Sequence, residues 1–106
     1  MTATGIDHIY IATHSYAATK AFWLDLGFTI GFETGHCSGQ LLPPDGTGAY
    51  LFINEVDADA PTEMQVYVDV VDSHAMSGSW EDTHWGTRTQ HLIDPDGNTV
   101  WLQDSH

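Results

Sequence analysis

The stretch Asp94-Pro95-Asp96-Gly97-Asn98-Thr99-Val100-Trp101-Leu102-Gln103 decides the fold, because it joins a tight turn to the strand that leaves it. Its first half favours a turn: proline fixes φ, glycine tolerates positive φ, and Asp and Asn accept local backbone hydrogen bonds. Its second half alternates, which predicts a strand with Val100 and Leu102 on one face and Trp101 and Gln103 on the other. We expect residues 87–93 to form the partner strand of this hairpin.

The size of the chain and its cysteine content limit the class of protein. Its 106 residues suffice for one domain, 1–106, with a modest core. No apolar run approaches membrane-spanning length, and the first residues lack the basic and apolar regions of a signal peptide. Cys37 is the single cysteine of the sequence, which excludes an internal disulfide. We therefore expect a cytoplasmic protein that does not bind membranes.

The charge balance restricts the classes of molecule that the protein can bind. Two basic residues, Lys20 and Arg88, stand against 15 acidic ones, which gives a net charge of −13 with neutral histidines. A surface of this kind repels nucleic acid and anionic membranes and attracts cationic small molecules or basic proteins. The acidity is equally explained by solubility or salt tolerance. We expect no nucleic-acid partner.

Periodicity and turn signals place the remaining elements. We expect strands at 6–13, 28–33, 37–42, 48–54 and 64–71, and a helix at 16–26 that begins at the N-cap Ser15 and stops at Gly27. The helical spacing of its apolar residues predicts the face that covers a sheet, made of Ala18, Ala21, Phe22 and Leu26. A helix of one or two turns begins near Asp72 or Ser73, and residues 81–86 form a loop. The order of these elements repeats, which predicts two modules, at about 5–57 and 63–104.

Four segments carry a family resemblance. They are Asp7-His8-Ile9, Ala21-Phe22-Trp23 with Leu26-Gly27-Phe28, Trp85-Gly86-Thr87-Arg88, and Asp94-Pro95-Asp96-Gly97-Asn98. In this order they resemble the vicinal oxygen chelate superfamily, which contains glyoxalase I, the bleomycin-resistance proteins and the extradiol dioxygenases. The small bleomycin-resistance-like members are the most similar. The resemblance covers nearly the whole chain.

The resemblance implies a fold and an assembly. The fold is α+β, with paired βαβββ modules that form a cup-shaped mixed sheet with helices outside. Between Val71 and Trp85 the sequence is shorter than in the family, so we expect a shortened second module. An edge missing from that module could be supplied by a partner chain. We therefore expect a homodimer, with the modules paired within one chain or between chains.

The metal positions of the family can be tested against this sequence. Metal-dependent members take His or Glu ligands from the first and last strands of each module, and these positions fall on His8, Phe52, Gln65 and Trp101. A divalent ion needs several imidazole or carboxylate ligands. His8 is the one well-placed candidate, so we expect no metal cofactor and no catalytic residue. The alternative is a metal-dependent lyase, isomerase or dioxygenase that uses His8 with shifted ligands such as Glu55 or His91.

The side of the strands that faces the cup predicts a ligand site. It is rich in aromatic residues interspersed with a few polar ones, which is typical of small-molecule sites and attracts cations and planar rings. The predicted ligand-binding residues are His8, Tyr10, Phe52, Asn54, Gln65, Tyr67, Asp69, Trp85, Trp101 and Gln103. The main hypothesis is a metal-independent protein that binds or sequesters a cationic or planar aromatic compound, such as an antibiotic. Two alternatives are the enzyme above and an interaction domain for a basic protein.

Overall fold

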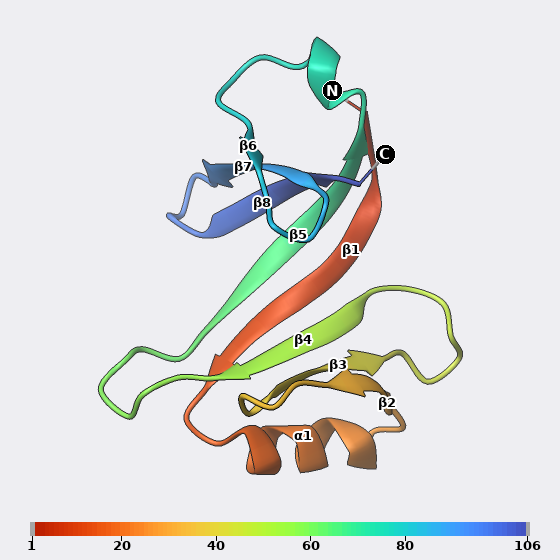
Figure 1. The fold of residues 1–106 in the computed structure, drawn as a ribbon, viewed down its shortest axis with the longest axis vertical. Helices are drawn as coiled ribbons and strands as arrows, with labels where there is room; N and C mark the ends of the chain where they lie inside the picture. Colours follow the sequence, from red (N-terminus) through yellow and green to blue (C-terminus); the bar gives the residue numbers. More distant parts are fainter. Residues whose placement is uncertain (1, 106) are drawn as a thin grey trace. The chain divides into compact units, whose positions relative to one another are not determined.

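The computed structural model describes residues 2–105, which form one α-helix, one 3₁₀ turn and eight strands (Figure 1). The helices are α1 (Tyr16–Asp25) and η1 (Ser73–Ala75). The strands are β1 (Thr2–Thr13), β2 (Thr29–Glu33), β3 (Ser38–Leu42), β4 (Tyr50–Glu55), β5 (Glu63–Val71), β6 (Glu81–Asp82), β7 (Arg88–Ile93) and β8 (Thr99–Asp104). Parallel and antiparallel pairs both occur, which confirms an α+β fold with mixed strand pairing.

The chain divides into two compact units. One unit, here called the helical unit, is His8–Met64. The other, here called the hairpin unit, combines the chain up to Asp7 with the chain from Gln65 onward. The predicted modules at 5–57 and 63–104 remain a prediction. So does the domain range 1–106, because Met1 and His106 lie outside the described residues.

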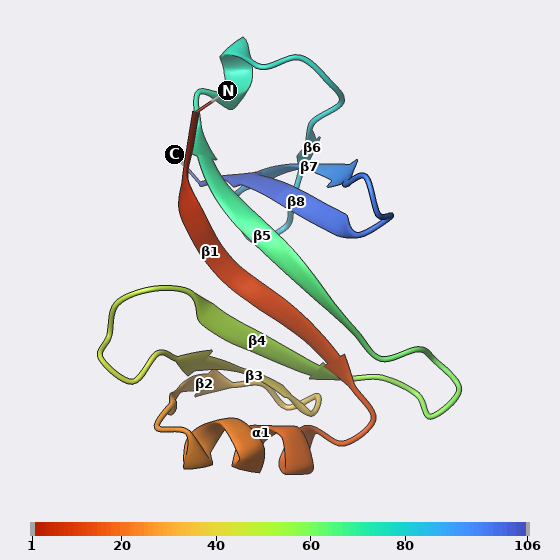
Figure 2. The ribbon, with the colours of Figure 1, turned by 180° about the vertical axis from the view of Figure 1, so that it is seen from behind.

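The helical unit is a four-stranded sheet covered on one face by α1. Its strand order is β2-β3-β4-β1, in which β1 runs parallel to β4 and the other pairs are antiparallel (Figure 2). The buried cluster between α1 and the sheet consists of Ile11, Tyr16, Leu41, Leu51 and Ile53. Leu51 and Ile53 therefore form a core face, which confirms the predicted alternation of β4.

Helix α1 begins and ends where the sequence predicts. The Ser15 hydroxyl accepts a hydrogen bond from the Ala18 backbone N–H at 3.2 Å, as an N-cap does. Gly27 has a φ of +103°, a backbone conformation that glycine adopts without the penalty of a Cβ atom. The predicted span of 16–26 is thus correct to within one residue at the C-terminus.

The predicted packing face of α1 is wrong. Ala18, Ala21, Phe22 and Leu26 are exposed, and the exposed fraction of Phe22 reaches 61%. Tyr16, Trp23 and Leu24 contact the sheet instead. These three residues also have helical spacing, and the rings of Tyr16 and Trp23 bury more apolar area than alanines can. Tertiary packing therefore decides which of these two sets of helix residues faces the sheet.

The hairpin unit contains the start of β1 followed by β5, β8, β7 and β6 in strand order. Strand β5 runs parallel to β8, and β8 pairs antiparallel with β7. The Asp94 carboxylate closes the turn between β7 and β8 by accepting hydrogen bonds from the backbone N–H of Asp96 at 2.9 Å and of Asn98 at 2.8 Å. Gly97 has a φ of +89°. The predicted hairpin is therefore confirmed in both its turn and its strands.

The segment after β5 is shorter than a normal helix and strand. It holds the single turn η1, where a short helix was predicted, and the two-residue strand β6, where a loop was predicted at 81–86. The prediction fails at Glu81 and Asp82 because acidic residues have low β-propensity, whereas pairing with β7 makes them a strand. The described chain between β5 and β7 therefore holds no helix longer than this single turn.

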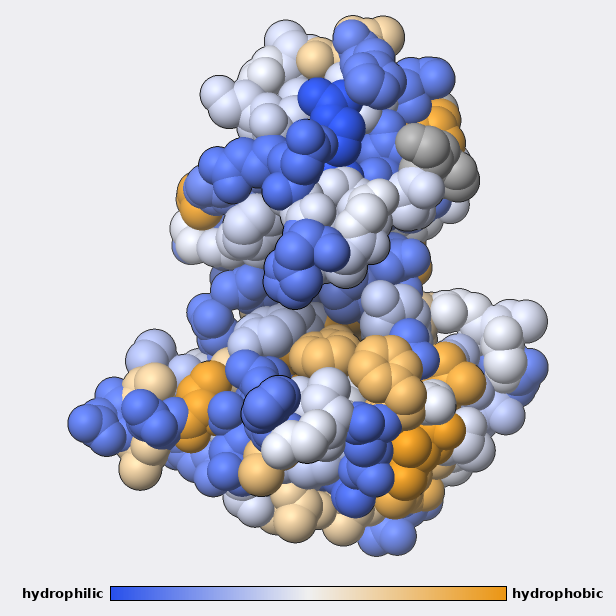
Figure 3. Space-filling view, viewed as in Figure 1, coloured by the Kyte–Doolittle hydropathy of each residue, from blue (hydrophilic) through white to orange (hydrophobic). Residues whose placement is uncertain are grey.

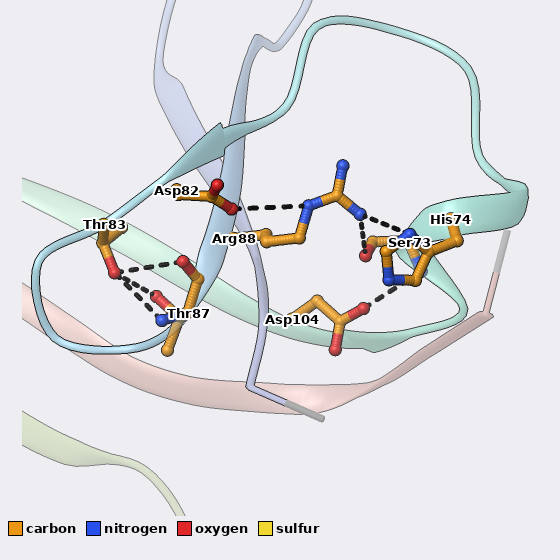
Figure 4. Close-up of polar contacts among 7 residues, drawn as sticks. All are labelled: Ser73, His74, Asp82, Thr83, Thr87, Arg88 and Asp104. Carbon is orange, nitrogen blue, oxygen red and sulfur yellow. Dashed lines mark hydrogen bonds and ion pairs between the residues drawn. The ribbon is translucent and has the colours of Figure 1, made fainter.

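Arg88 anchors this short segment to the sheet (Figure 4). Its Nη1 donates to Ser73 Oγ at 2.9 Å, its Nε lies 3.8 Å from Asp82 Oδ1, and its guanidinium lies over the Trp80 ring. Asp104, which is 5% exposed, accepts from the Ser73 backbone N–H at 3.1 Å. The side chain of Arg88 thus stabilises the segment between β5 and β7.

Candidate ligand-binding faces

The face of the helical unit that lies opposite α1 carries four predicted site residues, His8, Tyr10, Phe52 and Asn54. Strand register places them together, because Tyr10 is the partner of Phe52 on the adjacent strand and His8 is the partner of Tyr50. Successive residues of a strand point to opposite faces, so the core residues Leu51 and Ile53 point to the other face, toward α1. The predicted assignment of these four residues to one face is therefore correct.

The contacts within this face orient its rings. His8 stacks on Tyr50, with ring centroids 4.7 Å apart and an interplanar angle of 11°. The Asn54 Nδ2 donates to the Tyr10 hydroxyl at 3.0 Å. Phe32 lies 6.2 Å from Phe52 between ring centroids. The result is a wall of aromatic rings with one hydroxyl–amide pair.

Phe32 and Tyr50 are members of this face that the predicted site omits. Phe32, Gln40 and Phe52 form one row across β2, β3 and β4. The register of β2 shifts between Ile30 and Phe32, so simple alternation does not assign Phe32 to a face. Tyr50 alternates with Leu51 and could have been found from the sequence pattern.

The hairpin unit carries the other six predicted residues, Gln65, Tyr67, Asp69, Trp85, Trp101 and Gln103. Tyr67, Trp101 and His91 form a row across β5, β8 and β7. The rings of Tyr67 and Trp101 are nearly parallel, with centroids 5.7 Å apart and an angle of 8°, and His91 lies 5.2 Å from Trp101. Val68 and Leu102 point to the opposite face, as their alternation predicts.

The polar residues of this face hold the aromatic ones in place. Gln65 Oε1 accepts from the Trp101 indole N–H at 2.8 Å. Gln103, only 6% exposed, donates through Nε2 to Asp7 at 3.2 Å and accepts through Oε1 from the Trp85 indole at 3.4 Å. Asp69 and Gln103 are cross-strand partners, so the carboxylate is on the same face. All six predicted residues are therefore brought together.

Two hydrogen-bond partners on this face lie in β1 and were not predicted. The Thr4 hydroxyl donates to Asp69 Oδ2 at 2.6 Å, and the Asp7 carboxylate accepts from Gln103. Both pairs join residues more than sixty positions apart in the sequence. No local pattern signals such pairs, because they depend on how the start of β1 pairs in the hairpin unit.

The arrangement of possible metal ligands is sparse. Among residues 2–105, no group of three His, Cys, Asp or Glu side chains is close enough to hold a metal ion. Glu55 accepts from the Tyr16 backbone N–H at 2.9 Å, at the start of α1. It therefore lies on the α1 side of the sheet, whereas His8 lies on the opposite side. A shifted ligand set that combines His8 with Glu55 does not fit this geometry.

Comparisons with known proteins support the fold. No family model matches the sequence, and no curated protein sequence matches it. A glyoxalase/bleomycin resistance protein/dioxygenase superfamily member from Vibrio splendidus 12B01 is similar in structure, with a TM-score of 0.69 and 15% identity over 92% of this chain and 96% of that chain. Methylmalonyl-CoA epimerase from Mycobacterium tuberculosis has a TM-score of 0.71 and 16% identity over 99% of this chain and 90% of that chain. The chain thus has the fold of glyoxalase/bleomycin resistance/dioxygenase superfamily members, as its sequence resemblance implies.

Proposed function

We propose that this protein binds a planar aromatic small molecule, preferably a cation, without a catalytic metal, and that it sequesters this ligand. The observation that carries the proposal is the row of Tyr67, Trp101 and His91, in which Gln65 fixes the Trp101 indole. A preoriented indole loses little conformational entropy when a ligand stacks on it. Aromatic faces attract planar rings and cations.

Charge supports the preference for a cation. The chain carries a net charge of −13, and Asp69 lies on the same face as the aromatic row. A negative field raises the local concentration of cations and their association rate. Sequestration needs affinity and no chemistry, and a micromolar Kd corresponds to about −8 kcal/mol. A drug or an antibiotic with a flat cationic ring system fits these requirements.

A homodimer is also part of the proposal. Strand β2 ends the strand order, and its outer edge has no strand partner within residues 2–105. Ile30, Phe32, Leu26 and Leu42 are exposed around this strand. Figure 3 shows hydrophobic side chains gathered over the helical unit on the face drawn. These features support association between copies, which light scattering during gel filtration would measure.

We propose a cytoplasmic localisation for this protein. Cys37 is exposed and unpaired with another cysteine, which suits a reducing compartment such as the cytoplasm. None of the helices in the described part of the chain is long and apolar enough to cross a membrane.

The test is a calorimetric titration of the protein with proflavine, a planar aromatic cation. Acridone, which is planar and neutral, is the ligand control. We expect proflavine to bind more tightly than acridone, and Trp101→Ala or Tyr67→Ala to weaken binding at least tenfold, or about 1.4 kcal/mol. Leu92→Ala, on the opposite face of β7, should leave binding unchanged. Equal affinities in wild type and Trp101→Ala would contradict the assignment.

A metal-dependent enzyme of the lyase, isomerase or dioxygenase class is the second candidate. It is favoured by His8, which is 8% exposed and occupies the first ligand position that the resemblance implies. One of the similar structures is an epimerase. Elemental analysis of protein purified without chelator or metal-affinity tag separates the two candidates. Stoichiometric Fe, Mn, Ni or Zn that disappears in His8→Ala would favour the enzyme over sequestration.

A further inference from the structure

An open groove of about 510 Å³ lies on the α1 side of the helical unit. It forms where β1 ends, α1 begins and the chain enters β5, and these segments lie at the same end of the unit in both views (Figures 1 and 2). The aromatic face with Tyr10 and Phe52 is on the other side of the same sheet. The groove is therefore separate from the site proposed above.

The walls of the groove are apolar and exposed to solvent. Phe22 and Met64 line it and have exposed fractions of 61% and 65%. Trp23 also lines the groove and contacts Phe22 edge to face, with ring centroids 5.4 Å apart and an angle of 85°. Exposed apolar side chains that line one cavity indicate a binding site more strongly than the same side chains scattered singly.

The polar groups of the groove are hydroxyls and one carboxylate. The Thr13 and Thr19 hydroxyl oxygens lie 2.8 Å apart, and both residues line the groove with Glu63. A hydroxyl that donates one hydrogen bond keeps lone pairs for an N–H donor. Glu63 is the one charged residue in the lining. The polar groups thus favour a ligand that donates hydrogen bonds and carries positive charge.

The distribution of basic residues disfavours an anionic ligand. Lys20 and Arg88 are the two basic residues of the sequence, and neither lines the groove. Lys20 binds Glu33 at 2.8 Å, and Arg88 binds Ser73. With a net charge of −13, the protein repels anions and attracts cations at this surface.

We propose that this groove is a second ligand site, which binds a small amphiphilic amine. The apolar body of the amine packs against Phe22, Trp23 and Met64, and its ammonium group donates to Glu63 and Thr19. The volume of about 510 Å³ is within the range of about 300–1,000 Å³ that small-molecule sites occupy. The site requires no metal and no partner chain.

The experiment is a two-dimensional ¹⁵N–¹H NMR titration of the whole protein with 4-phenylbutylamine. The uncharged 4-phenyl-1-butanol is the matched ligand control. We expect shifts of the Ala18, Thr19 and Phe22 amide signals, and at least threefold tighter binding of the amine than of the alcohol. Glu63→Gln should remove that preference without weakening the alcohol.

Substitutions in the wall complete the test. Phe22→Ser and Met64→Ser should each weaken amine binding at least fivefold. The control is Leu26→Ser, which changes an apolar residue of similar exposure, 57%, just beyond α1 and outside the groove. An equal loss in Leu26→Ser, or amine-induced shifts confined to the Tyr10 and Trp101 faces, would overturn the proposal. So would a change from dimer to monomer in Phe22→Ser with unaltered amine-induced shifts, because a second copy would then occupy the groove.

Discussion

The indole of Trp101 lies parallel to the phenol ring of Tyr67, and its N–H donates to Gln65 two residues before that tyrosine. One strand, β5, therefore supplies both the stacking ring and the hydrogen-bond acceptor that orient a single side chain on β8. The indole is held in two directions, by ring contact and by a hydrogen bond. This double restraint leaves the indole little conformational freedom, which is the property that the proposed ligand binding requires.

Removing the hydrogen bond without removing the aromatic ring tests this restraint. Trp101→Phe keeps a ring near Tyr67 but loses the indole N–H, and Gln65→Ala removes the acceptor. In a double-mutant cycle we expect a coupling free energy of about 1 kcal/mol between the two residues, because a net hydrogen bond contributes about that much. Urea unfolding followed by circular dichroism measures it. Strict additivity of the two substitutions would show that the hydrogen bond does not restrain the indole.

Gly39 lies in β3 directly beside Tyr16, and its lack of a side chain is required by this contact. A Cβ atom built on Gly39 would overlap the Tyr16 hydroxyl and approach the Phe32 carbonyl oxygen to 2.9 Å. The backbone carbonyl of β2 cannot move without disturbing the strand pair. We expect Gly39→Ala to destabilise the protein by about 1–3 kcal/mol, as overpacking does.

Gly35→Ala is the matched control for this prediction. A Cβ atom at Gly35 would meet no heavy atom within 4 Å. Its free energy of unfolding should stay within about 0.5 kcal/mol of the wild type. Equal stability of Gly39→Ala and Gly35→Ala would contradict the close contact between β3 and Tyr16.

The sequence predicts those features that depend on local chemistry. The hairpin of β7 and β8 follows from Asp94 and Gly97, whose side-chain hydrogen bond and positive φ are both satisfied within the turn itself. The start of α1 follows from Ser15, and the core face of β4 follows from the alternation of Leu51 and Ile53. In each case the cause lies within a few residues of the effect.

The features that the sequence misses depend on distant partners. Helix α1 has two apolar stripes with helical spacing, and the sheet beneath it selects the one with Tyr16 and Trp23. Strand β6 exists because Arg88 and Thr89 pair with it, and Phe32 joins the aromatic face through a register shift in β2. The pairing of Gln65 with Trp101 spans 36 residues of sequence. Local patterns do not contain this information.

Acidification should show how much the Asp94 turn contributes to the stability of the protein. Hydrogen bonds from the Asn98 side chain and backbone lower the pKa of Asp94 below its usual value. A carboxyl with a lowered folded-state pKa contributes stability above its unfolded pKa of about 3.9, and this contribution is lost as the pH falls through the folded pKa. We expect Asp94→Asn to be less stable than the wild type at pH 6 and to lose less stability on acidification below about pH 4.

The control for this turn is Asp96→Asn, which removes a charge from the same turn but leaves the Asp94 carboxylate in place. Urea unfolding at a series of pH values measures both variants. The acid dependence of Asp96→Asn should stay closer to the wild type than that of Asp94→Asn. Parallel curves for wild type and Asp94→Asn would contradict the role of the Asp94 carboxylate.

The stability of the protein at high pH should show the effect of the raised pKa of the Tyr16 phenol. Burial, and then the hydrogen bond and negative charge of Glu33, raise the pKa of Tyr16 to about 12. Its hydroxyl donates to Glu33 Oε2 at 2.6 Å, and Lys20 donates to the same oxygen at 2.8 Å. An unfolded tyrosine ionises near pH 10. Below that pH both states keep the proton and the stabilising contribution is complete; between about pH 10 and 12 the unfolded state loses its proton first, so stability falls as the pH rises.

Tyr16→Phe should therefore flatten the decline in stability between about pH 10 and 12. We expect the wild type to lose on the order of 1–2 kcal/mol more than the variant over this interval, less than the full pKa difference implies, because the Glu33 side chain is 37% exposed and water screens part of its charge. Urea unfolding at pH 9 and pH 11.5 measures the loss.

Absorbance at 295 nm measures the ionisation of Tyr16 independently, since the difference between the wild-type and Tyr16→Phe titrations isolates one phenol. A midpoint near pH 10 in that difference would contradict the burial of Tyr16 and its hydrogen bond to Glu33, whereas a midpoint near pH 12 is the expected result.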